Sequence, residues 1–152
     1  MKLDHYKLKA EQDFTTFEFS SEGPKGKIIK VVQFQQIEES NVYNLAFGDF
    51  NPLTAELDDK IVTDNRDSEK VLATVVAAVY SFTEHYPDTW VYAIGSTEAR
   101  TRLYRMGINK YFDIANNDFN ILGEHESGWE QYKKGRYYTA FAVYKKTSKF
   151  EL

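Results

Sequence analysis

The sequence contains no cysteine, and this absence excludes every chemistry that depends on a thiol. The chain of 152 residues cannot form a disulfide framework, a zinc–thiolate site, an iron–sulfur cluster or a thiol nucleophile. Its eight glycines and three prolines are too few for a fibrous or low-complexity chain. No apolar run approaches the length of a membrane span, and residues 1–7 lack the apolar segment of a signal peptide. We therefore expect a cytoplasmic protein that does not bind a membrane.

The composition is that of an ordinary globular domain that is rich in aromatic residues. Hydrophobic residues make up 42% of the chain, charged residues 28% and aromatic residues 16%. The length suits a single domain over 1–152 with a sizeable core. The chain has 19 basic and 23 acidic residues. The resulting net charge of −4 disfavours a general nucleic-acid-binding surface but does not exclude a local basic patch.

The order of the predicted elements indicates the α+β class with a mostly antiparallel sheet. Apolar residues recur at spacings of three and four over 68–85, which predicts a long helix that Pro87 ends. A second helix is predicted over 98–106, with Gly107 as its C-terminal cap. Short connections between the first strands favour an antiparallel meander. The predicted strands are 14–19, 28–37, 42–50, 61–63, 89–94, 108–114, 119–123 and 137–144, and a turn or short helix is predicted at 128–135.

Two polar segments lack the spacing that ligand-binding loops require. In Gly23-Pro-Lys-Gly-Lys27 two residues separate the glycines, whereas a Walker loop needs four and then Lys-Ser/Thr, so we interpret it as a hairpin turn. The acidic stretch 49–69 lacks the register of an EF-hand, and we interpret it as a hydrated loop. Asp67 or Ser68 is suited to cap the helix that follows. The three histidines are isolated from one another, so no metal site is predicted.

The strongest candidate site is the junction between the strand at 89–94 and the second helix. A glycine, a serine and a threonine precede this helix, and a helix N-terminus presents backbone amides and a positive dipole end to an anion. Three arginines follow within two turns, and guanidinium groups match phosphate and carboxylate oxygens. We predict a site for a small anionic ligand or RNA, formed by Gly95, Ser96, Thr97, Arg100, Arg102 and Arg105.

A purely structural interpretation of the same residues stays open. Glu98 and Arg102 have the spacing of a stabilising i,i+4 pair, worth about 0.3–0.5 kcal/mol. Ser96 or Thr97 is also an ordinary N-cap residue. In addition, the acidic stretch 49–69 offers carboxylates that would neutralise the arginines.

The segment Gly-Ser-Thr-Glu-Ala-Arg-Thr-Arg-Leu-Tyr-Arg at 95–105 resembles a family of small uncharacterised bacterial proteins. The resemblance also includes Ser21-Glu-Gly-Pro-Lys-Gly-Lys27, Tyr43-Asn-Leu-Ala-Phe-Gly-Asp49 and Asp67-Ser-Glu-Lys-Val-Leu-Ala-Thr74. It covers most of the chain and implies no particular activity.

The second half of the chain also resembles the GNAT-type N-acyltransferases, in which a strand, a long helix and a strand precede a helix carrying Ala-…-Leu-Tyr-…-Gly. The matching pieces are 61–63, 68–85, 89–95 and Ala99-…-Leu103-Tyr104-Arg-Met-Gly107. This resemblance implies a GNAT-like sheet, coenzyme A as cofactor and Tyr104 as general acid to the departing thiolate. The glycine-containing loop that holds the coenzyme pyrophosphate in that family has no counterpart in 64–70.

From these observations we predict a binding module that needs no cofactor, rather than an enzyme. One alternative is a divergent acyltransferase that uses Tyr104 and coenzyme A. Another is a protein-interaction or antitoxin-like partner, which would use the tyrosine and lysine side chains expected to be exposed over 129–146. The sequence leaves the oligomeric state open.

Overall fold

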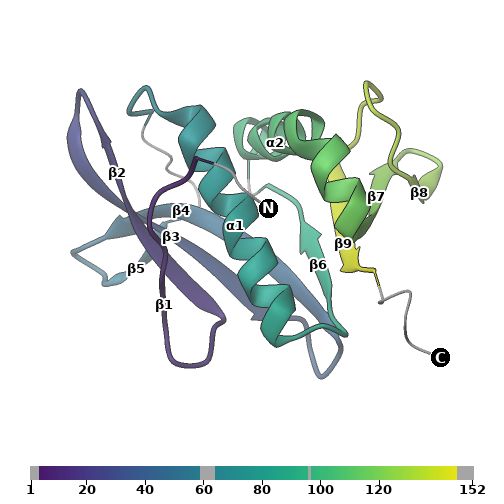
Figure 1. Ribbon diagram of the computed structural model, residues 1–152, viewed down its shortest axis with the longest axis horizontal. Helices are drawn as coiled ribbons and strands as arrows, with labels where there is room; N and C mark the ends of the chain where they lie inside the picture. The colour runs from purple at the N-terminus through teal and green to yellow at the C-terminus, as the bar shows by residue number, and fades with distance from the viewer. Residues whose placement is uncertain (1–3, 59–63, 96, 147–152) are drawn as a thin grey trace.

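The computed structural model describes residues 4–58, 64–95 and 97–146, and its α+β architecture confirms the predicted class (Figure 1). Nine strands of the described chain form one sheet, and both helices pack against the same face of it. The helices are α1 (Ser68–His85) and α2 (Glu98–Asp118). The strands are β1 (Lys9–Ala10), β2 (Thr16–Gly23), β3 (Gly26–Gln36), β4 (Val42–Asn51), β5 (Glu56–Asp58), β6 (Trp90–Ala93), β7 (Phe119–His125), β8 (Gly128–Gln131) and β9 (Ala140–Lys145).

The sheet has the order β1-β2-β3-β4-β6-β9-β7-β8 and is mostly antiparallel, as the short connections predict. The exception is the parallel pairing of β4 with β6, which α1 connects. β6 pairs only with the N-terminal part of β4, from Val42 to Asn44. β5 pairs with the C-terminal part of β4, from Asp49 to Asn51. β3 pairs with one edge of β4 along most of its length. On the opposite edge, β6 pairs with the N-terminal part of β4 and β5 with the C-terminal part.

The main core lies between the two helices and the sheet, and its first half is packed between α1 and strands β2, β3 and β4. Every second residue of these strands faces α1, and the apolar side of α1 packs against them. For example, the rings of Phe34 on β3 and Phe82 on α1 stack with centroids 4.2 Å apart. Burying each such side chain contributes about 1.5–3 kcal/mol, which holds a valine-rich helix of modest intrinsic propensity. The helix spans Ser68–His85, as predicted.

The second helix is longer than predicted, because Gly107 lies inside α2 instead of ending it. Gly107 is buried, and a Cβ atom added there would lie 3.1 Å from Cδ2 of Leu72 on α1. The glycine thus permits close packing of the two helices, which offsets its helix penalty of about 0.5–1 kcal/mol. The strand predicted at 108–114 is therefore wrong, and the buried Tyr104 and Tyr111 continue the packed side of α2.

The remaining differences are small. The segment predicted as a turn or short helix at 128–135 begins with strand β8, which pairs with β7. The hairpin turn at Pro24-Lys25 is confirmed, since β2 pairs with β3 on both sides of it. The strand predicted at 61–63 lies outside the described residues. Neither helix of the described chain combines the length and the apolarity that a membrane crossing requires.

Candidate functional site

The N-terminal ends of α1 and α2 lie next to each other (Figure 1). They border a pocket of about 410 Å³. One wall comes from the entry to α1, and another comes from the first turns of α2. A buried lysine of β3 completes the lining. We call this space the helix-end pocket and define it by Lys30, Asp64, Asp67, Thr97, Arg100 and Arg102.

Lys30 forms a buried ion pair with Asp49 on the neighbouring strand. The register of β3 and β4 places the two residues directly opposite each other, on the face that the helices cover. The Lys30 Nζ lies 2.6 Å from Oδ1 of Asp49, and the two side chains are 1% and 12% exposed. A buried ion pair requires close geometry to offset the desolvation of both charges. The register therefore places a compensated cation beside the helix-end pocket.

Arg100 projects inward from the first turn of α2. The residue is 3% exposed, and its guanidinium carbon lies 5.5 Å from the ring centroid of Phe47 on β4. This contact is a cation–π interaction, which holds the guanidinium against the sheet. Arg102 lines the same pocket and is exposed to solvent. In the described chain Glu98 and Arg102 form no salt bridge, so Arg102 is not held by the predicted i,i+4 pair.

The residues that precede α2 are used largely for local structure. Thr97 is the N-cap residue, and its Oγ1 accepts a hydrogen bond from the Arg100 backbone amide at 3.2 Å. The Gly95 amide donates to Oγ1 of Thr101 at 3.0 Å. A Cβ atom at position 95 would lie 2.2 Å from the Thr101 nitrogen, so only glycine permits this approach. Ser96 lies outside the described residues.

Arg105 points away from the helix-end pocket. Its guanidinium carbon lies 4.3 Å from the ring centroid of Tyr137, and its Nη1 donates to the Tyr138 carbonyl at 3.5 Å. Tyr104 is buried and lines an apolar cavity of about 110 Å³ between the two helices and the sheet. The structure therefore brings Arg100 and Arg102 to one pocket and places Arg105 elsewhere.

Asp67 belongs to a hydrogen-bonded group that joins three distant segments. The residue occupies the N-cap position of α1, but its side chain does not make the predicted cap. Instead its Oδ2 accepts hydrogen bonds from the Tyr6 hydroxyl at 2.6 Å and from the Ser21 hydroxyl at 2.5 Å. Burial, followed by the hydrogen bond to Asp67, raises the pKa of Tyr6. The Tyr6 hydroxyl thus keeps its proton and fixes the carboxylate at the pocket.

Asn65 ties the β2–β3 hairpin to the entry of α1. The residue is 1% exposed. Its Nδ2 donates to the Gly26 carbonyl at 2.8 Å, and its Oδ1 accepts from the Lys25 amide at 2.7 Å. A Cβ atom at position 23 would lie 2.0 Å from the Asn65 carbonyl oxygen, so Gly23 allows the hairpin to pack against this segment. The predicted hairpin turn therefore packs against Asn65, and it supports the segment that carries Asp64 and Asp67 to the helix-end pocket.

Sequence reasoning missed most of the buried polar residues around the pocket. Tyr6, Ser21 and Asn65 meet only through contacts between segments far apart in the chain. One signal was present in the sequence. Lys30 shares one face of its strand with the apolar residues Val32 and Phe34, which indicates a lysine that faces the core. The acidic stretch does reach the arginines, since Asp64 and Asp67 line the same pocket.

The aromatic residues near the C-terminal end divide between core and surface. Trp129 and Tyr137 are exposed, as are Lys133 and Lys134. Tyr132 and Tyr138 are buried, together with residues of the core. The exposed surface expected over 129–146 therefore holds fewer aromatic side chains than the sequence alone indicates.

Comparison with known proteins identifies the family. Searches of curated proteins and of solved structures each return no match. One family model, described as a family of unknown function, matches residues 2–146 and so covers nearly the whole chain. The chain thus belongs to DUF6934, a family of unknown function.

Proposed function

We propose that the protein is an anion-binding module whose helix-end pocket receives a phosphate-bearing or carboxylate-bearing ligand. The observation that carries this proposal is that Lys30, Arg100 and Arg102 all line one pocket between two helix N-termini. Helix N-termini attract anions, and guanidinium groups bind phosphate and carboxylate oxygens through paired hydrogen bonds.

The three cations have different roles in this proposal. Arg102 is exposed and makes the direct contact with the ligand. Arg100 is buried, so its charge acts through a less polar medium, in which electrostatic attraction is stronger than in water. Lys30 is buried too, but Asp49 compensates its charge, so Lys30 shapes the pocket wall more than it adds net charge. The contacts with Phe47 and Asp49 hold these two groups in place before the ligand arrives.

The acidic residues of the pocket restrict the class of ligand. Asp64 and Asp67 line the same space, and two carboxylates disfavour a ligand that carries only negative charge. A ligand with one anionic group and several hydrogen-bond donors satisfies both halves of the lining. A mononucleotide has this chemistry, because its phosphate suits the arginines and its ribose hydroxyls suit the carboxylates. We therefore favour a small nucleotide-like ligand over RNA.

Thermal unfolding with a panel of ligands tests the proposal. The panel contains mononucleotides, inorganic phosphate, coenzyme A and short RNA. We expect a mononucleotide at about 100 times Kd to raise the Tm of the wild-type protein by about 5–10 °C. Arg102→Ala loses this shift, whereas Arg105→Ala, on the same helix but outside the pocket, keeps it. The proposal is wrong if no anion raises the Tm of the wild-type protein or if Arg102→Ala responds like the wild type.

A divergent acyltransferase is the second candidate function. One observation favours it: α1, β6 and α2 with Tyr104 follow one another as the GNAT-type resemblance implies, and β6 lies parallel to β4, whereas the first strand of that resemblance, 61–63, lies outside the described residues. This candidate predicts acetyl-coenzyme A binding that survives in Tyr104→Phe while turnover falls. Calorimetric titration that finds no binding at millimolar coenzyme would remove it.

A further inference from the structure

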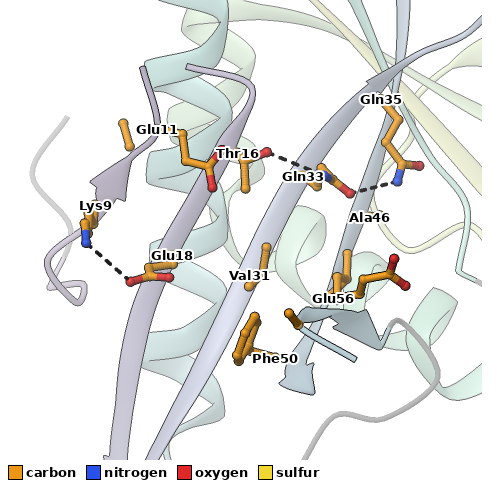
Figure 2. Close-up of a pocket in the computed structure, with 13 residues that line it drawn as sticks. Lys9, Glu11, Thr16, Glu18, Val31, Gln33, Gln35, Ala46, Phe50 and Glu56 are labelled. Atoms are coloured by element: carbon orange, nitrogen blue, oxygen red, sulfur yellow. Dashed lines mark hydrogen bonds and ion pairs between the residues drawn. The ribbon is translucent and has the colours of Figure 1, made fainter. Parts of the chain in front are cut away.

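A groove of about 670 Å³ lies on the face of the sheet that the helices do not cover (Figure 2). Glu18 and Val31, which line it, alternate along their strands with the core residues Phe19 and Val32. Successive strand residues point to opposite faces, so the groove lies on the side away from α1. Figure 2 accordingly shows α1 behind the strands that carry the groove residues.

The groove has two walls and a floor formed by different strands. One wall is β1 with the residue after it, and the other is β5 with the turn before it. The floor is formed by β2, β3 and β4. We call the whole groove the sheet groove and define it by Glu11, Thr16, Val31, Gln33, Ala46 and Glu56.

The floor combines apolar contact area with a row of hydrogen-bonding side chains. Val31, Ala46 and Phe50 supply the apolar part. Beside them, Gln35 Nε2 donates to Gln33 Oε1 at 2.9 Å, and Gln33 Nε2 donates to Thr16 Oγ1 at 3.5 Å (Figure 2). Such a row of uncharged groups can pair with the backbone of an extended peptide, while the apolar area receives side-chain methylenes.

The charged side chains that line the sheet groove are mostly acidic. The groove contains three glutamates and one lysine. Lys9 and Glu18 form an exposed pair at 3.9 Å, which contributes little. Among the described residues, Glu11 and Glu56 have no cationic partner within 4.0 Å, and they stand on opposite walls. The groove therefore offers two separated carboxylates to a positively charged occupant.

We infer that the sheet groove binds an extended segment of a partner protein that carries two or more lysine or arginine side chains. A metal ion is not the occupant, because the described chain holds no cluster of three or more potential metal-ligating side chains. Two cationic side chains reach Glu11 and Glu56, and their aliphatic stems cover Val31 and Phe50.

Fluorescence anisotropy with labelled heptapeptides tests the inference. One peptide alternates lysine and alanine, and a matched peptide alternates glutamate and alanine. We expect the lysine peptide to bind and the glutamate peptide not to bind. The double variant Glu11→Gln/Glu56→Gln should raise the Kd of the lysine peptide about tenfold. The control Glu39→Gln/Glu126→Gln removes the same charge at exposed sites outside the groove and should leave Kd unchanged.

The inference is overturned if the lysine peptide does not bind, if both double variants weaken it equally, or if spermidine binds as tightly as the peptide. Amide chemical shifts provide a second readout, since the peptide should move the signals of Val31 and Ala46. Shifts confined to the helix ends would also contradict the inference. Arg102→Ala should bind the peptide normally, so the outcome is independent of the anion-binding proposal.

Discussion

Lys30 on β3 stands directly opposite Asp49 on β4, and their charged groups meet at 2.6 Å in the interior, beside the helix-end pocket. Lys30 also lines the space where α1 and α2 begin. Stability and the proposed site therefore depend on the same register of two strands.

Lys30→Met should destabilise the protein by about 3–5 kcal/mol, because it leaves the Asp49 carboxylate buried without its ammonium partner. Urea unfolding measures the change. The double variant Lys30→Met/Asp49→Leu should recover most of the loss, since it removes both buried charges. Lys9→Met serves as the control, because its pair with Glu18 is exposed and should change stability by less than about 1 kcal/mol. Equal effects of Lys30→Met and Lys9→Met would contradict the structural account.

Gly23→Ala should destabilise the protein by about 1–3 kcal/mol, because the new methyl group would overlap the Asn65 carbonyl oxygen. The same substitution should weaken the binding of a ligand to the helix-end pocket, because Asn65 leads directly into α1, whose N-terminal end borders that pocket. Chemical denaturation measures the first effect, and ligand-induced Tm shifts measure the second. Lys25→Ala, in the same turn, is the matched control. A Gly23→Ala protein as stable as the control would show that the hairpin does not constrain this segment.

Tyr138→Phe should raise the pKa of Glu130 toward its ordinary value. The hydrogen bond from the Tyr138 hydroxyl is the largest cause that lowers the pKa of this carboxyl group, and His125 and Arg136 add to it. A carboxyl group with a lowered pKa stabilises the fold above its ordinary pKa, and this contribution is lost as the pH falls through the lowered value. The loss of stability from Tyr138→Phe should therefore be smaller in acid than at neutral pH. Carbon-13 titration of the Glu130 carboxyl checks the pKa, and an unchanged value would contradict the prediction.

Alkaline pH should unfold the protein cooperatively with the ionisation of its tyrosines. Burial is the largest cause of a raised pKa for six of them: Tyr6, Tyr80, Tyr92, Tyr111, Tyr132 and Tyr138. The folded state then favours neutral hydroxyl groups, so stability is present below about pH 10 and is lost as the pH rises above that value. Tyrosinate absorbance and far-ultraviolet circular dichroism should change together. Full ionisation of the tyrosines without loss of structure would contradict the prediction.

The sequence was sufficient where a local pattern is enough to specify structure. The bounds of α1 follow from apolar spacing, and the first strands follow from aromatic and β-branched runs separated by turn residues. It was insufficient for α2, because the pattern does not show that Gly107 meets Leu72 on another helix. A glycine that ends a helix and a glycine that lets two helices approach have the same local appearance.

By itself the sequence determined the α+β class, the first helix and the presence of arginines at the start of the second, since each depends on neighbouring residues. Only the tertiary structure decided which cations share a pocket. Arg100 and Arg102 meet Lys30 because strand register and helix packing bring distant segments together, whereas Arg105, on the same helix, turns to Tyr137. Helical rotation and long-range contacts separate residues that lie side by side in the sequence, and they join residues that lie far apart.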